Sequence, residues 1–120
     1  MPPTPVVFYA EENVAPFLQW FDELGEAVQN KIIGRLELLR ARGHELRRPH
    51  ADTLRDGIHE LRVVSQHVNY RVLYFFHGRG AVISHGITKE GVVPPREIDL
   101  AVARMRRFAA DPVKYTYRED

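Results

Sequence analysis

The chain has 120 residues, 44% of them hydrophobic and 28% charged, and this length is enough to bury one core without a metal or a disulfide. It has no cysteine, which excludes a disulfide framework and a thiolate zinc site, and its six histidines show no tight ligand spacing, so we expect no metal and no other cofactor. No apolar run approaches the roughly 20 residues of a membrane span and no signal peptide is evident, so we expect a cytoplasmic protein that does not use a membrane.

The net charge of +1 is unevenly distributed along the chain. Residues 1–30 contain five acids and no Lys or Arg, whereas residues 31–50 contain six bases and two acids. Such asymmetry permits a basic face that could meet phosphate, and a solvated helix face without a partner produces the same pattern. Both interpretations stay open.

The first elements follow from the spacing of apolar residues. Val6 to Ala10 is a short apolar run, typical of an edge strand. From Glu12 to Leu24, and again from Glu26 to Arg42, apolar residues recur three and four positions apart, which predicts a hairpin of two amphipathic helices. Asn13 is a possible N-cap of the first helix, and Gly43 is expected to end the second.

The connection from Gly43 to Asp56 is polar and basic, and Pro49 prevents the helix from continuing. We expect a loop here. Its arginines Arg47, Arg48 and Arg55 are candidates for binding a nucleic-acid backbone, and a solvated connector with no partner is the alternative.

Three strands with two tight turns are predicted next. Polar and apolar residues alternate from Ile58 to Val64, whereas Tyr70 to Phe76 is nearly all β-branched or aromatic and Ala81 to Ile87 is rich in Val and Ile. Glycines at 78 and 80 allow a turn with positive φ between the last two strands. Tight connections join antiparallel neighbours, so these strands form a meander.

A final helix is predicted from Arg96 to Ala110, after two prolines and before Pro112. The whole chain, residues 1–120, is therefore expected to form a single α+β domain, with a mostly antiparallel β-sheet, an N-terminal helical hairpin and a C-terminal helix. Residues 1–5 and 112–120 are expected to be loose tails, and the second is either disordered or lies along an edge of the sheet.

Several motifs in a fixed order carry a resemblance to a known family. They are PHADTLRDGIHELRV, then YRVLYFF, a glycine turn, a strand that ends in HGITK, and P-P-R-E-I-x-x-A-x-x-R, which runs into the last helix. Over about residues 8–110 the chain resembles the HigB-like, phage-derived branch of the RelE/ParE toxin superfamily. The resemblance implies a RelE-like fold, a toxin of a type II toxin–antitoxin pair, and ribosome-dependent cleavage of mRNA. The implied partners are a helix-turn-helix antitoxin of the HigA-like kind, the ribosome and mRNA.

Cleavage of RNA by its own 2′-hydroxyl needs a base, cations around the phosphate, and an acid for the leaving oxygen. Arg71, which matches the arginine of the family's Y-R-x-L-Y motif, is the candidate clamp for the phosphate, and Arg62 assists it. Lys89 matches the family's lysine and binds phosphate or acts as base. His85 is the candidate acid, and His59 titrates in the same range.

Each of these assignments has a structural alternative. Arg62 could pair with Glu60 on the same strand face, and Arg71 could be a buried arginine paired to Glu97 or Asp99. His85 shares strand parity with residues 83 and 87, which is typical of a core histidine. His59 could stack on an RNA base or be a plain strand residue.

The alternative function is a toxin relative that no longer cleaves RNA, or a ParE-like inhibitor that binds gyrase. Two features favour it: the net charge is weak, and Glu90 follows Lys89 where the family often has a second lysine.

Overall fold

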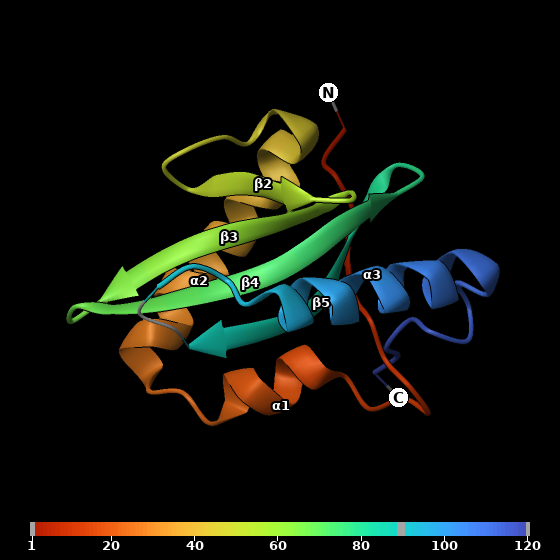
Figure 1. Cartoon of the computed structure of the whole chain (residues 1–120), viewed down its shortest axis with the longest axis horizontal. Coiled ribbons are helices and arrows are strands. Elements are labelled where there is room, and N and C mark those ends of the chain that lie inside the picture. The colour runs from red at the N-terminus through yellow and green to blue at the C-terminus, as the bar shows by residue number, and fades with distance from the viewer. Residues whose placement is uncertain (1, 89–90, 120) are drawn as a thin grey trace.

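The structure is a computed structural model that describes residues 2–88 and 91–119. These residues form one five-stranded sheet, with helices packed on both of its faces (Figure 1). The elements in chain order are β1 (Val6–Phe8), α1 (Pro16–Asp22), α2 (Glu26–Arg42), the 3₁₀ turn η1 (Gly43–Glu45), β2 (Ala51–Arg55), β3 (Ile58–Ser65), β4 (Val68–His77), β5 (Gly80–Thr88) and α3 (Pro95–Ala110). The predicted α+β fold, with its N-terminal helical hairpin and C-terminal helix, is confirmed.

The sheet order is β1-β5-β4-β3-β2, and only the β1–β5 pair is parallel. The meander of β3, β4 and β5 is confirmed. The prediction of a loop from Gly43 to Asp56 is wrong in part, because Ala51–Arg55 forms the edge strand β2. Local pattern does not reveal this strand, since Ala51 is its only buried residue and polar side chains occupy three of its five positions.

Two hydrophobic clusters hold the helices against the sheet. Side chains alternate between the two faces of β4, so that Val72 and Tyr74 pack toward α1 and α2, whereas Leu73 and Phe75 pack toward α3. The alternation breaks in β5, where the register with β4 shifts by one residue opposite the Leu73–Tyr74 step.

Because of this bulge, the prediction that His85 shares its sheet face with both residues 83 and 87 is wrong. Ile83 belongs to the cluster under the helical hairpin, while Ile87 belongs to the cluster under α3. The His85 ring bonds to Glu97 of α3, so His85 shares its face with Ile87 and not with Ile83. Strand parity counted along the sequence fails here because a bulge adds one residue.

The ends of the elements differ from the sequence prediction at one helix. The helix α1 begins at Pro16 with Ala15 as its N-cap, so the assignment of Asn13 as cap is wrong. The Asn13 side chain instead exchanges two hydrogen bonds with the backbone of Arg118. Gly43 ends α2 as predicted, with φ of 55° and its N–H bonded to Leu39 O.

The C-terminal segment lies along an edge of the sheet, which is one of the two alternatives for this tail. The Tyr117 N–H donates to Phe8 O, and Thr116 forms an isolated bridge with Tyr9. The rings of Tyr9 and Tyr115 stack with centroids 5.6 Å apart. At the other end, the Thr4 N–H donates to Arg40 O of α2. Within residues 2–88 and 91–119, no helix is long and apolar enough to cross a membrane.

Candidate functional site

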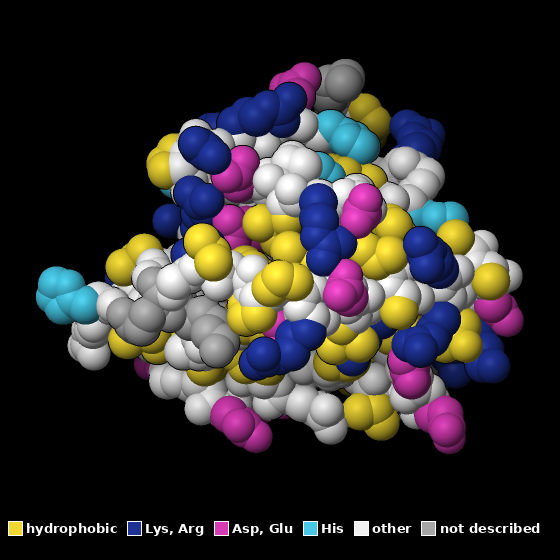
Figure 2. Space-filling view, in the orientation of Figure 1, with side chains coloured by type: hydrophobic (Ala, Val, Ile, Leu, Met, Phe, Trp, Pro, Cys, Tyr) yellow, Lys and Arg dark blue, Asp and Glu magenta, His cyan; other side chains and the backbone are white. Residues whose placement is uncertain are grey.

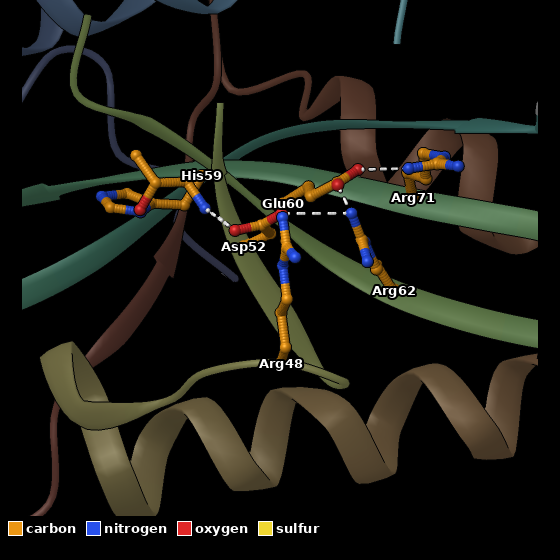
Figure 3. A network of polar contacts seen from close by, with 7 residues as sticks. Arg48, Asp52, His59, Glu60, Arg62 and Arg71 are labelled. Carbon is orange, nitrogen blue, oxygen red and sulfur yellow. Dashed lines mark hydrogen bonds and ion pairs between the residues drawn. The ribbon is translucent and has the colours of Figure 1, made fainter. Parts of the chain in front are cut away.

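Arg62 and Arg71 face each other across β3 and β4, in direct register. Both bind the same carboxylate: Arg71 Nη1 lies 2.8 Å from Glu60 Oε1, and Arg62 Nε lies 2.9 Å from Glu60 Oε2 (Figure 3). The Glu60 side chain is 1% exposed, and that of Arg71 is 15% exposed. One buried carboxylate therefore holds two guanidinium groups on the α3 face of the sheet.

The network continues outward to the protein surface. Arg62 Nη2 lies 3.2 Å from Asp52 Oδ2, and Arg48 Nη2 lies 2.8 Å from the same oxygen. The hydrogen bond from Arg48 is the main reason that the pKa of Asp52 is lowered. We call these five residues the arginine–carboxylate network: Arg48, Asp52, Glu60, Arg62 and Arg71. It contains three cations and two anions.

Arg62 and Arg71 also line a hollow of about 460 Å³, together with Arg35 of α2. We call it the arginine hollow; its lining is Arg35, Pro49, His50, Arg62, Val63, Val64, Asn69, Tyr70 and Arg71. Arg35 Nε donates to Arg62 O at 3.0 Å, which fixes the third guanidinium beside the strand. The hollow therefore brings three arginines from three elements to one place.

Two buried polar atoms beside this hollow have no hydrogen-bond partner, namely His50 Nδ1 and Arg71 Nε. Unpaired buried donors and acceptors are costly, and in a native structure each calls for an explanation. Sequence reasoning did not find Arg35 or His50. The spacing of α2 places Arg35 outside its apolar stripe, but no local signal says that it reaches β3.

The structural alternatives for the two arginines are supported in part. Arg62 pairs with Glu60, as the alternative states. Arg71 is a mostly buried, paired arginine, but its partner is Glu60, and the expected partners Glu97 and Asp99 are wrong. Both of those acids are engaged elsewhere, because Glu97 bonds to His85 and Asp99 pairs with Arg55.

His85 lies apart from the network's contacts. Its Nδ1 lies 2.8 Å from Ser84 Oγ and its Nε2 lies 3.0 Å from Glu97 Oε1, so both ring nitrogens have partners inside the protein. Burial is the main reason that its pKa is lowered, and nearby Arg104 acts in the same direction while Glu97 opposes it. Lys89, the fourth predicted catalytic residue, lies outside the described residues.

The predicted RNA-binding residues separate into two groups. Arg47, Arg48 and His59 line a second hollow, of about 640 Å³, at the junction of η1 with β2, β3 and β4. Arg55 does not line it. Its guanidinium lies 2.8 Å from Asp56 and 2.7 Å from Asp99, where it ties the β2–β3 turn to α3.

The charges on the visible face of the molecule are mixed. Figure 2 shows Lys and Arg side chains interspersed with Asp and Glu, without one continuous basic area on this face. Among the described residues, no three His, Asp or Glu side chains are grouped so that they could hold a metal ion.

The sheet, the helical hairpin and the C-terminal helix define an α+β domain compatible with the RelE-like fold. The model of one protein family, described as Phage derived protein Gp49-like (DUF891), matches residues 19–106. The chain belongs to this phage-derived family, which is of the RelE-like toxin type. A search of the curated proteins returned no match.

Proposed function

We propose that this protein is the toxin of a type II toxin–antitoxin pair, and that it is an endoribonuclease which cleaves mRNA on the ribosome. The observation that carries the proposal is the arginine hollow, where Arg35, Arg62 and Arg71 line one space of about 460 Å³. Guanidinium groups match the oxygens of a phosphodiester in charge and geometry. Membership in a family of the RelE-like toxin type supports the same function.

In the proposed reaction, the 2′-hydroxyl oxygen attacks the adjacent phosphorus and its proton passes to a base. The bond from phosphorus to the 5′ oxygen then breaks, an acid protonates that oxygen, and a 2′,3′-cyclic phosphate remains. Arg71 and Arg62 bind the phosphate oxygens and stabilise the dianion that forms between these steps. Each of these two guanidinium groups donates one hydrogen bond to the Glu60 carboxylate, which holds both of them in place. Glu60 is therefore a positioning residue.

Lys89 is the proposed base or a further phosphate ligand, at a position outside the described residues. His85 is the predicted acid, and in that role its ring must release either Glu97 or Ser84, because both nitrogens are bonded. An acid held in this way acts only after a rearrangement when RNA binds. The proposed partners are the ribosome, mRNA and a helix-turn-helix, HigA-like antitoxin, and the proposed location is the cytoplasm.

The test is induced expression in a bacterial host, followed by growth curves and by mapping of transcript ends. We expect growth arrest and loss of full-length transcripts. Arg71→Ala is expected to reduce the cleavage rate by about 100-fold or more, as the loss of one stabilising donor does in other enzymes. Arg106→Ala is the matched control, because Arg106 is exposed on α3, away from the hollow. Equal arrest by the wild type, Arg71→Ala and Lys89→Ala would refute the site assignment.

A second candidate function is a relative that does not cleave RNA, such as an inhibitor that binds gyrase. The observation that favours it is the charge balance of the arginine–carboxylate network. There the carboxylates of Glu60 and Asp52 neutralise two of the three arginine charges, which leaves less positive charge for a phosphate. DNA supercoiling by purified gyrase, measured with and without the protein, separates the two. Inhibited supercoiling with intact mRNA would replace the nuclease by the gyrase inhibitor.

A further inference from the structure

The 640 Å³ hollow is separate from the arginine hollow and is built from different side chains. We call it the histidine hollow; its lining is Gly43, His44, Leu46, Arg47, Arg48, Ala51, Asp52, Thr53, His59, Tyr74 and Phe76. Its size is in the range of small-molecule sites, about 300–1,000 Å³. Tyr74 belongs to the cluster under the helical hairpin, whereas Glu60 and the guanidiniums bound to it lie on the α3 face. The two hollows therefore present different chemistry to a ligand.

Aromatic rings form one side of the histidine hollow. The His44 ring stacks on Phe76 with centroids 3.6 Å apart, and the His59 ring stacks on Tyr74 at 5.3 Å. His59 also meets the edge of Phe76, at 5.3 Å. Tyr74 is 2% exposed and belongs to the core, whereas His59 and Phe76 are half-buried and His44 is exposed. The accessible rings can therefore offer a flat, apolar surface to a planar group.

One hydrogen bond orients the His59 ring. Its Nδ1 lies 3.1 Å from Thr53 Oγ1 on the neighbouring strand β2. The other ring nitrogen, Nε2, has no hydrogen-bond partner among the described residues, and the His59 ring lines the histidine hollow. This leaves a polar atom beside the stacking surface that can read the edge of a planar ligand.

Arg47 supplies positive charge at the rim of the hollow. Its guanidinium donates to the carbonyl oxygens of His44 and Leu46, and it forms no ion pair within residues 2–88 and 91–119. Arg48 lies beside it but is held by Asp52 through two nitrogens, 2.8 and 3.0 Å from Oδ2. Arg47 therefore keeps an uncompensated charge, while Arg48 links this hollow to the arginine–carboxylate network.

We propose that the histidine hollow binds one nucleotide unit of single-stranded RNA, with the base stacked on His44 or His59 and a phosphate on Arg47. Stacking on aromatic rings beside a cation is how proteins bind single strands without strong sequence preference. The choice of RNA rests on the proposed function. The site itself rests on the rings and the cation described here, and it would hold a nucleotide that flanks the one cleaved in the arginine hollow.

The test uses nucleoside 5′-monophosphates, because they have no phosphodiester and binding is measured apart from cleavage. Isothermal titration calorimetry gives Kd, and proton NMR follows the His59 ring signals. We expect binding by the wild type, and about tenfold weaker binding for Arg47→Gln and for the double variant His44→Ala, His59→Ala, which removes both rings on which the base can stack. The matched controls are Arg106→Gln and His67→Ala, which make the same kinds of change at exposed positions on α3 and on the β3–β4 turn. Both controls are expected to bind like the wild type.

Three outcomes would overturn the inference. They are the absence of nucleotide binding by the wild type, equal weakening by Arg106→Gln and Arg47→Gln, and binding of inorganic phosphate as tight as that of the nucleotide. The last would leave the rings without a role. A wild type that binds nucleotides through Arg47 but cleaves no transcript would refute the proposed nuclease and leave this site standing. A wild type that cleaves transcripts but binds no nucleotide in the histidine hollow would refute this site and leave the proposed nuclease standing.

Discussion

Glu60→Gln tests how far the fold depends on one buried carboxylate. Glu60 is 1% exposed and accepts hydrogen bonds from Arg62 and Arg71, at 2.9 and 2.8 Å. The glutamine side chain has the same shape but only one acceptor oxygen. Whichever way its amide is oriented, the NH₂ group faces a guanidinium donor. The substitution therefore leaves at least one arginine without its partner.

The size of the effect follows from the exposure of each arginine. Removing one member of a buried ion pair costs ~3–5 kcal/mol, because a buried charge is left uncompensated. Arg71 is 15% exposed and falls near this case, whereas Arg62 is 37% exposed and also contacts Asp52. An exposed pair contributes only ~0–1 kcal/mol. We therefore expect the free energy of unfolding to fall by about 3 kcal/mol, a large share of the ~5–15 kcal/mol typical of a domain.

Urea unfolding measures this loss, with far-UV circular dichroism and the fluorescence of the single tryptophan as probes. The matched control is Glu37→Gln on α2, an exposed acid that forms no ion pair among the described residues, for which we expect a change within ~0.5 kcal/mol. The double variant Glu60→Gln, Arg71→Gln is expected to lose less than the sum of its single variants, because no unpaired charge remains. Equal stability of Glu60→Gln and Glu37→Gln would refute the reasoning.

Further predictions concern three other positions. Gly86→Ala is expected to destabilise the fold by ~1–3 kcal/mol in the same urea assay, because the added methyl group would overlap the indole ring of Trp20; an unchanged midpoint would contradict this. Burial lowers the pKa of His85 below its ordinary value of 6.5, so the unfolded chain binds the proton more readily and stability is lost as the pH falls below 6.5. In His85→Gln, the curve of stability against pH should be flatter there, and an unchanged slope would refute the assignment. Arg55→Ala is expected to cost at most ~1 kcal/mol and to leave nucleotide binding unchanged, because its ion pairs with Asp56 and Asp99 are exposed and lie outside both hollows; weaker binding in the calorimetric titration would contradict this.

Within the site, the sequence predicted which residue types matter but not how they pair. Arginines inside apolar strands needed partners or a cleft, and Arg62 and Arg71 have both. The identity of Arg71's partner depended on register, which places Arg62 directly opposite it and Glu60 within reach. Arg35 and His44 carried no local signal at all, because their roles arise only when α2 and η1 pack beside the sheet.

The sequence by itself determined the two helices of the hairpin, the meander and the last helix, because apolar periodicity and turn residues act over a few neighbouring positions. Only the tertiary structure decided that Ala51–Arg55 is a strand, that a bulge turns His85 toward α3, and that one buried glutamate holds two arginines. These features join residues that lie far apart along the chain. Strand register and packing select such contacts among many that the same local preferences allow.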